Sequence, residues 1–282
     1  MDKKLIVVTG GAGFIGSHLC ARLVADGHRV ISLDNYFTGS RDNHVPGVEY
    51  REGHTKDIAK HISETPDLIY HLGEYARIAK SIDEPEVVWD LNVAGTFGVA
   101  QFWRAKRCKL VYAGSSTKFE ARDKSPYAWA KAANSELVAG YGAWYDLSYS
   151  IVYFYNVYGP GERGGVDNYG TIIETFRQNY LAGKAHEVRG DGSQTRAFTH
   201  VEDTVDGIVL AGEKGGKDEY AICAPEVYSI LDVAHMFGGD ISFLPPTKTT
   251  RSSGAMDSAN LQALGWQPRH TLAAYIEEAK KK

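Results

Sequence analysis

Cysteine is scarce in this sequence of 282 residues, and Cys20, Cys108 and Cys223 lie far apart. No Cys-x-x-Cys or Cys/His spacing typical of metal ligands occurs, so we expect neither a disulfide framework nor a structural zinc site. The ten histidines are scattered, and their spacing predicts no metal site. No apolar run approaches the roughly 18 residues of a membrane span. A strand-like run follows Met1–Lys4 directly, so we expect no signal peptide and a cytoplasmic protein.

Long blocks of like charge are also absent. The longest is Lys280-Lys281-Lys282, and 31 basic residues face 35 acidic ones, giving a net charge of −4. This balance argues against a nucleic-acid-binding surface, although a few placed arginines could still hold an anionic substrate. With 43% hydrophobic and 23% charged residues, the chain has the composition of a globular protein with a sizeable core.

Short apolar runs alternate with helical stretches along the first half of the chain. Strands are predicted at residues 5–8, 30–33, 68–72, 110–113 and 151–155, and helices at residues 15–25, 85–104 and 127–145. Such alternation predicts an α/β fold with a Rossmann-type, doubly wound parallel sheet. The loops that follow the strands of such a sheet lie along one edge, where ligands bind.

Glycines at Gly10, Gly13 and Gly16 lie between the first predicted strand and the first predicted helix. In this context Gly10 permits a tight turn, Gly13 lets a pyrophosphate approach the helix N-terminus, and Gly16 lets the helix pack close to the strand. Asp34 ends the second strand, where its carboxylate can bind an adenosine ribose and would repel a 2′-phosphate. The pattern therefore predicts NAD rather than NADP; the alternative is a structural turn with a surface aspartate.

The pattern changes after Asn156. Glycine-rich turns at residues 159–161, 164–165 and 190–192 separate short segments, which predicts a smaller second lobe. We therefore predict an NAD-binding domain over residues 1–156, with a return segment at about 198–220, and a smaller C-terminal lobe mainly over residues 157–282. A helix at 202–214 is expected to return to the first domain, and a final helix from Thr271 is expected to pack.

Tyr127 and Lys131 are four residues apart and share one face of a predicted helix. A tyrosine with an unperturbed pKa of about 10 is a poor base at neutral pH. A neighbouring ammonium and the positive ring of oxidised NAD favour the phenolate. Ser115 and Ser116 follow a strand at the ligand edge, where a hydroxyl could share a proton with the phenol and a substrate.

Several ordered motifs resemble the extended short-chain dehydrogenase/reductase family, specifically its NAD-dependent sugar-nucleotide epimerases and dehydratases, such as the UDP-glucose 4-epimerases. The similarity covers nearly the whole chain, and it implies that the C-terminal, substrate-binding lobe, mainly residues 157–282, binds a sugar nucleotide. The matching segments are residues 9–16, 33–39, 92–96, 115–117, 127–131, 155–160, 190–196 and 264–268.

The resemblance implies roles for individual residues. Tyr127 would be the base, Lys131 would bind the nicotinamide ribose, and Ser115, with Ser116 as the alternative, would bridge base and substrate. Asn156, Arg196 and Arg251 would bind the nucleotide diphosphate, and Ser115 and Tyr127 would bind the sugar. The implied cofactor-binding residues are Gly10, Gly13, Phe14, Ile15, Gly16, Asp34, Asn35, Phe37, Thr38, Gly39, Leu72, Asn92, Tyr127, Lys131 and Tyr155.

The resemblance implies an NAD-dependent enzyme that oxidises a sugar at C4. Dehydratases of this family carry an acid after the bridging hydroxyl, whereas this chain has Ser116 and Thr117. We therefore expect a 4-epimerase (an isomerase) acting on UDP-glucose/UDP-galactose or the N-acetylhexosamine pair. A dehydratase, decarboxylase or 4-keto-reductase is the alternative, and a non-catalytic NAD-sensing protein is a further one.

Relatives also imply a homodimer built through helices 85–104 and 127–145. Trp89, Phe97, Phe102, Trp103 and Trp144 are candidates for its interface or, equally, for the core.

Three departures from the family pattern stand out. The segment from Ser115 to Tyr127 is short, His54 replaces an aspartate that contacts adenine, and Glu74 to Arg77 replaces small uncharged residues. His54 either replaces the adenine contact or leaves it absent. Arg77 either meets an acidic or phosphate group or pairs with Glu74.

Overall fold

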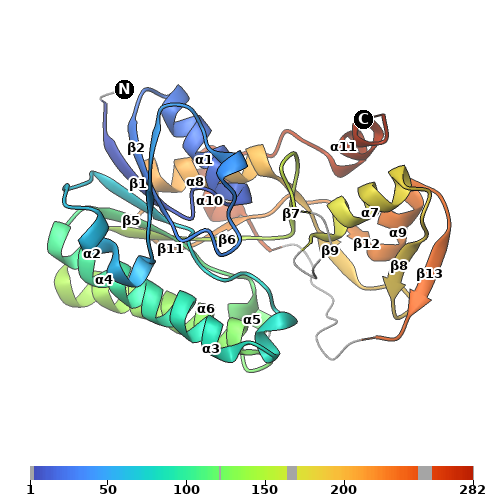
Figure 1. Cartoon of the computed structure of the whole chain (residues 1–282), viewed down its shortest axis with the longest axis horizontal. Helices are drawn as coiled ribbons and strands as arrows, with labels where there is room; N and C mark the ends of the chain where they lie inside the picture. Colours follow the sequence, from blue (N-terminus) through green and yellow to red (C-terminus); the bar gives the residue numbers. More distant parts are fainter. Residues whose placement is uncertain (1–2, 121, 164–169, 247–255, 282) are drawn as a thin grey trace. The chain divides into compact units, whose positions relative to one another are not determined.

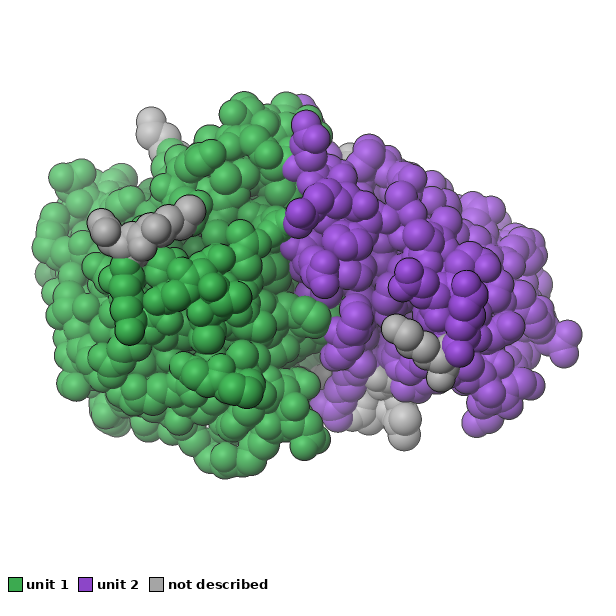
Figure 2. All heavy atoms as spheres, turned by 90° about the horizontal axis from the view of Figure 1, so that it is seen from above, with its two compact units in different colours: residues 1–153, 205–221, 259–266 green, residues 154–204, 222–258, 267–282 purple. Residues whose placement is uncertain are grey.

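The computed structural model describes residues 3–120, 122–163, 170–246 and 256–281. The chain forms two compact units (Figure 2): unit 1 holds residues 1–153, 205–221 and 259–266, and unit 2 holds residues 154–204, 222–258 and 267–282. Among the described residues, no helix is long and apolar enough to cross a lipid bilayer.

A seven-stranded sheet forms the centre of unit 1, and its strand pairs from β6 to β3 are parallel. The predicted α/β fold is therefore confirmed. The inner strands are apolar and almost wholly buried, as expected for a sheet covered on both faces. In spatial order the strands are β11 (Lys217–Ile222), β6 (Tyr149–Phe154), β5 (Lys109–Ala113), β4 (Leu68–His71), β1 (Leu5–Thr9), β2 (Arg29–Asp34) and β3 (Val48–Glu52).

Helices cover both faces of this sheet (Figure 1). One face carries α1 (Phe14–Ala25), α8 (Val201–Lys214) and α10 (Ala259–Ala263), and the other carries α2 (Ile58–His61), α3 (Pro85–Val88), α4 (Gly95–Lys106) and α6 (Pro126–Tyr145). Short helices lie in the connections: η1 (Arg41–Asn43), η2 (Thr55–Asp57), η3 (Lys80–Ile82) and α5 (Thr117–Glu120).

The helix predicted over residues 85–104 is interrupted in its middle by a π-helical segment, η4 (Trp89–Ala94), between α3 and α4. This segment turns Asn92 inward, where it is fully buried. Of the aromatic residues proposed for an interface, Phe102 and Trp103 are buried in the core. The exposed fractions of Trp89, Phe97 and Trp144 are 59%, 49% and 68%.

In the part of unit 2 that the structure describes, short strand pairs and three helices surround an apolar core of their own. The pairs are β7 (Val157–Tyr158) with β10 (Thr199–His200), β9 (Thr195–Ala197) with β12 (Val227–Ser229), and β8 (His186–Arg189) with β13 (Ile241–Leu244). The helices are α7 (Ile172–Leu181), α9 (Ile230–Phe237) and α11 (Leu272–Ala279). Thr271 caps α11 and accepts a hydrogen bond from the Ala274 amide, as the predicted helix start requires.

Candidate functional site

The glycine turn between β1 and α1 has the geometry that the sequence predicts. Gly10 has φ +76°, and a Cβ placed there would lie 2.8 Å from the Cα of Gly73. A Cβ on Gly16 would lie 2.0 Å from the carbonyl oxygen of Gly10. Larger residues at these two positions would displace backbone, so the glycines allow the strand, the turn and α1 to approach one another.

A groove opens at this edge of the sheet, next to the N-terminus of α1. Gly13 caps the helix and has no side chain to bind the first-turn amides, which favours binding of an anion there. Phe14, Ile15 and Gly16 form this first turn. Eight predicted cofactor residues line the groove: Gly10, Gly13, Asp34, Asn35, Phe37, Thr38, Gly39 and Leu72. Seven further residues also line it: Leu33, Gly53, Thr55, Gly73, Glu74, Tyr75 and Leu91.

Asp34 lies in this groove with its carboxylate held by backbone. Its Oδ2 accepts the Ala12 N–H at 2.9 Å, and its Oδ1 accepts the Tyr36 N–H at 2.8 Å. Burial raises the pKa of Asp34, and these two amides oppose the rise. Each oxygen retains acceptor capacity for a ribose hydroxyl. The glycine cradle and this carboxylate fit the dinucleotide cofactor that the sequence predicts.

Tyr127 and Lys131 lie one turn apart on α6, and both are buried. Ser125 caps this helix by accepting the Ala128 N–H, and the Tyr127 N–H donates to Ser81 Oγ. The Lys131 ammonium donates to the carbonyl oxygen of Ala113 at 2.6 Å and to the carboxylate of Glu74. Two of its three N–H donors thus have acceptors in the protein.

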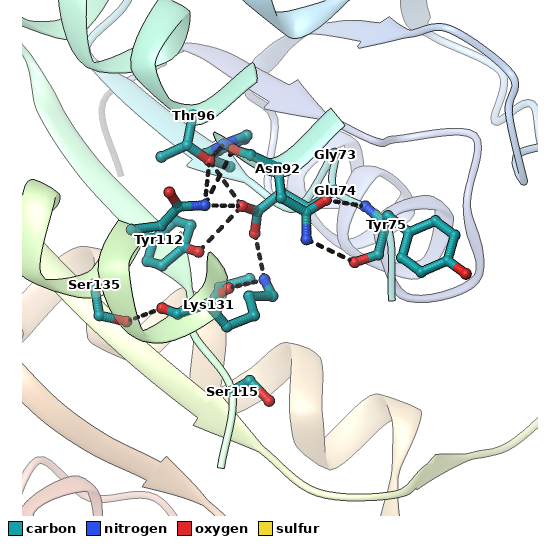
Figure 3. Close-up of polar contacts among 12 residues, drawn as sticks. Gly73, Glu74, Tyr75, Asn92, Thr96, Tyr112, Ser115, Lys131 and Ser135 are labelled. Carbon is teal, nitrogen blue, oxygen red and sulfur yellow. Dashed lines mark hydrogen bonds and ion pairs between the residues drawn. The ribbon is translucent and has the colours of Figure 1, made fainter. Parts of the chain in front are cut away.

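Glu74 is the centre of a buried polar cluster that the sequence did not assign (Figure 3). Its side chain is 1% exposed and forms an ion pair with Lys131, whose side chain is 6% exposed. The Oε1 atom accepts hydrogen bonds from Thr96 Oγ1 at 2.7 Å, Asn134 Nδ2 at 2.7 Å and Tyr112 Oη at 3.1 Å. Burial raises the pKa of Glu74, but Lys131 and His71 lower it further, so the net shift is downward and the carboxylate stays ionised.

His71 connects this cluster to the glycine turn. Its Nδ1 lies 2.7 Å from Thr9 Oγ1, and its Nε2 lies 3.0 Å from Thr96 Oγ1. Because the Thr96 hydroxyl donates to Glu74, His71 Nε2–H must be the donor to Thr96, which fixes the tautomer. Burial lowers the pKa of His71 to about 4, consistent with a neutral ring.

The loop after β4 is held from the other side by Asn92. Its Oδ1 accepts the Tyr75 N–H at 2.7 Å, and its Nδ2 donates to the Tyr75 carbonyl oxygen at 3.0 Å. These two bonds fix the backbone directly after Glu74. Asn92 thus acts on the groove wall through Tyr75, and it is not among the residues lining the groove.

Ser115 follows β5, and both Ser115 and Ser116 are buried. The Ser115 Oγ accepts hydrogen bonds from the Thr117 hydroxyl at 3.0 Å and the Thr117 N–H at 3.3 Å. These contacts use the Ser115 oxygen only as an acceptor, so its proton can be donated to a ligand.

Two of the three predicted diphosphate-binding residues lie together in unit 2. Asn156 Nδ2 donates to the carbonyl oxygen of Ala197 at 2.8 Å, which brings Asn156 next to Arg196. Arg196 Nη1 donates to the Thr195 carbonyl oxygen. Tyr155 packs with Ala197 in a small apolar cluster of the same unit. Arg251 lies outside the described residues.

Glu74, which we considered as a partner of Arg77, forms its ion pair with Lys131. Arg77 Nη1 donates to the carbonyl oxygen of Ala76. The His54 ring contacts Asp90 Oδ2 at 3.0 Å and accepts the Lys56 N–H, and the adjacent Gly53 and Thr55 line the groove in its place.

A group of potential metal ligands also occurs in unit 2, where ligand atoms of His200, Glu202 and His270 lie within 4.8 Å of one another. Sequence spacing could not reveal this group, because His270 comes from a distant segment. His270 Nδ1 is hydrogen-bonded to the buried Asp203 at 2.9 Å, and its Nε2 lies 3.3 Å from Glu202. The His200 and His270 rings stack at 4.2 Å. Each of the two imidazole rings is therefore held in place by contacts within the protein.

Comparison with known proteins gives a consistent result. Residues 6–224 match the family described as "NAD dependent epimerase/dehydratase family". The chain is 31% identical over 305 residues to a UDP-glucose 4-epimerase of Mycolicibacterium smegmatis, covering 96% of this chain and 95% of that protein. It is 28% identical over 293 residues to UDP-glucuronic acid decarboxylase 1 of Xenopus tropicalis, covering 95% and 69%.

Solved structures share the fold over the whole chain. A Thermus thermophilus UDP-glucose 4-epimerase in complex with NAD has a TM-score of 0.89 and 25% identity, with 98% of each chain covered. A Streptomyces venezuelae dTDP-glucose 4,6-dehydratase with NAD bound has a TM-score of 0.87 and 24% identity, covering 98% and 96%.

Proposed function

Because the chain belongs to the NAD-dependent epimerase/dehydratase family and uses NAD, we propose that it epimerises a nucleotide-activated hexose at C4. We propose UDP-glucose/UDP-galactose or the corresponding N-acetylhexosamine pair as substrates. The 31% identity over nearly the full length of a UDP-glucose 4-epimerase supports this assignment.

The proposed chemistry assigns one task to each side chain. Tyr127 removes the proton of the sugar 4-hydroxyl while Ser115 donates a hydrogen bond to the same oxygen. Lys131 offers its third N–H to the nicotinamide ribose. NAD, when bound, would supply the hydride acceptor for this oxidation and the hydride donor for the reduction that completes the epimerisation. Asn156, Arg196 and Arg251 hold the nucleotide diphosphate, for which guanidinium groups are suited.

The observation that favours epimerisation over elimination lies directly after Ser115. The next two residues are Ser116 and Thr117, and the Thr117 hydroxyl is hydrogen-bonded to Ser115. Elimination of water needs an acid at this point, and neither hydroxyl has a pKa suited to that role. Returning the hydride needs no such group.

Decarboxylation of a UDP-uronic acid is the second candidate. The similarity to UDP-glucuronic acid decarboxylase 1 over 95% of this chain supports it. It begins with the same oxidation at C4, so Tyr127, Lys131 and Ser115 would keep their tasks.

Proton NMR of the purified protein with UDP-glucose, UDP-N-acetylglucosamine and UDP-glucuronic acid, without added cofactor, separates these reactions. We expect the galacto epimer of at least one of the first two sugars. A pentose product from the uronic acid with neither epimer would replace the proposal by decarboxylation. A 4-keto-6-deoxy product would replace it by dehydration.

We further propose that the protein is a homodimer formed through η4, α4 and α6. Trp89, Phe97 and Trp144 are exposed on these helices, and the Trp89 ring stacks on that of Trp129 at 6.2 Å. Exposed aromatic residues in such a group are typical of a protein interface.

Replacing Phe97 and Trp144 together with lysine should weaken this dimer at least about tenfold, because aromatic anchors dominate interface energies. Sedimentation velocity at micromolar concentration measures the change. Phe243→Lys, at a residue of unit 2 that is 58% exposed, is the control and should leave the dimer intact. A monomeric unmodified protein would contradict the proposal.

A further inference from the structure

The Lys131 ammonium forms a buried ion pair with Glu74. A lysine that binds the ribose next to a positively charged nicotinamide ring places two positive charges close together. In this chain the lysine carries a buried partner, Glu74, and the same Glu74 lines the cofactor groove. The charge of the ammonium is therefore offset inside the protein before any ligand binds.

The surroundings of Glu74 show that it is held as an anion. Lys131, Thr96, Tyr112 and Asn134 all donate to its two oxygens, so every close polar neighbour stabilises the ionised form. A hydrogen-bond network in which every member has a partner rigidifies the groups in it, and this holds the carboxylate in place beside Lys131.

The position of Glu74 is also fixed through the backbone. Asn92 holds Tyr75 on one side, and on the other the Gly73 N–H donates to Thr9 Oγ1 at 3.0 Å. The residue thus sits between two anchored neighbours, and its carboxylate and Lys131 form a neutral pair at the groove wall.

We propose that Glu74 is a positioning residue that fixes Lys131 and neutralises its charge at the nicotinamide site, so that the lysine does not weaken the binding of oxidised NAD relative to the reduced form. The inference rests on the proposed task of Lys131 at the nicotinamide ribose. The electrostatic reason is that oxidised nicotinamide carries a positive charge and the reduced ring does not. An unpaired ammonium would disfavour only the oxidised form, whereas the neutral pair disfavours neither.

Glu74→Gln tests this directly, because it keeps the side-chain shape and removes the charge. The purified variant and the unmodified protein are each equilibrated with a fixed mixture of NAD+ and NADH, and the bound nucleotides are extracted and quantified. We expect the ratio of bound NAD+ to bound NADH to fall about tenfold, the order expected for one unit charge acting across several ångströms of protein.

Glu74→Gln with Lys131→Met is the matched control, because it removes both charges and should return the ratio to near that of the unmodified protein. Glu74→Ala provides a second single variant in case Glu74→Gln does not fold, and it should shift the ratio in the same direction. An unchanged ratio in a folded single variant overturns the inference, as does a double variant that shifts as far as the single one.

The readout does not depend on the sugar reaction. A shifted ratio in a protein that epimerises none of the tested sugars would leave the inference standing and remove the proposed function. Epimerisation with an unchanged ratio would do the reverse.

Discussion

Replacing Tyr127 with phenylalanine is expected to reduce turnover by about 10³-fold, the contribution typical of a positioned proton-transfer group. The side chain is 8% exposed and Phe preserves its shape, so the fold should tolerate the change. The cofactor groove is lined by residues other than Tyr127, and we therefore expect NAD to remain bound. The NMR assay measures turnover, and extraction of the purified variant measures bound NAD.

Tyr141→Phe is the matched control, because Tyr141 lies on the same helix, is 5% exposed and contacts Trp144 and Tyr145. It should retain turnover within about twofold, since its hydroxyl has no part in proton transfer. Substantial turnover by Tyr127→Phe would remove Tyr127 from the role of base. Loss of bound NAD in that variant would instead assign Tyr127 to cofactor retention.

Gly16→Ala should lower the free energy of unfolding by about 3 kcal/mol, at the upper end of overpacking effects. The new Cβ would meet the Gly10 carbonyl oxygen at 2.0 Å, a backbone atom that cannot rotate away. Either α1 or the turn must move, so we also expect weaker NAD binding. Thermal and denaturant unfolding, with and without NAD, measure both effects.

Gly140→Ala in α6 separates this clash from a general intolerance of side chains at glycines. A Cβ there would meet the far edge of the Trp144 ring at 2.9 Å, and because this is the outer end of a side chain that is 68% exposed, a small shift of the ring relieves the contact. Removing a glycine from a helix gains up to about 1 kcal/mol, so this variant should be at least as stable as the unmodified protein. Equal stability of both variants would contradict the close approach at Gly16.

Local sequence signals predicted the parts of the fold that they control. The first glycine turn, α1 and the Tyr127–Lys131 helix carry strong periodicity and punctuation, and the structure forms them at those places. The edge strand β3 was missed because its residues, Val48–Glu52, alternate with charges and it is only partly buried. The strand pairs of unit 2 were missed because several contain only two or three residues and form through distant pairing.

The same distinction applies to the site. The predicted cofactor residues that line the groove follow a motif of known spacing, whereas Glu74 gathers partners from three other segments. Thr96, Tyr112 and Asn134 are remote from it in sequence, and no spacing rule connects them. The signal available in the sequence was the position of Glu74, three residues after the fully buried strand β4, which ends at the ligand edge. A charged side chain buried there needs a partner inside the protein.

The π-helical segment η4 has a consequence for how this chain can vary. A π-turn holds one residue more than an α-turn, so deleting one residue between Trp89 and Asn92 would restore regular helix without shortening any loop. The deletion would rotate Asn92 by about 100° relative to the preceding turn. The amide would then leave the Tyr75 backbone, and the groove wall would lose its support. The number of residues in η4 is therefore constrained by the contact between Asn92 and Tyr75, which lies 17 residues earlier in the chain. Regular helix geometry alone would allow one residue fewer.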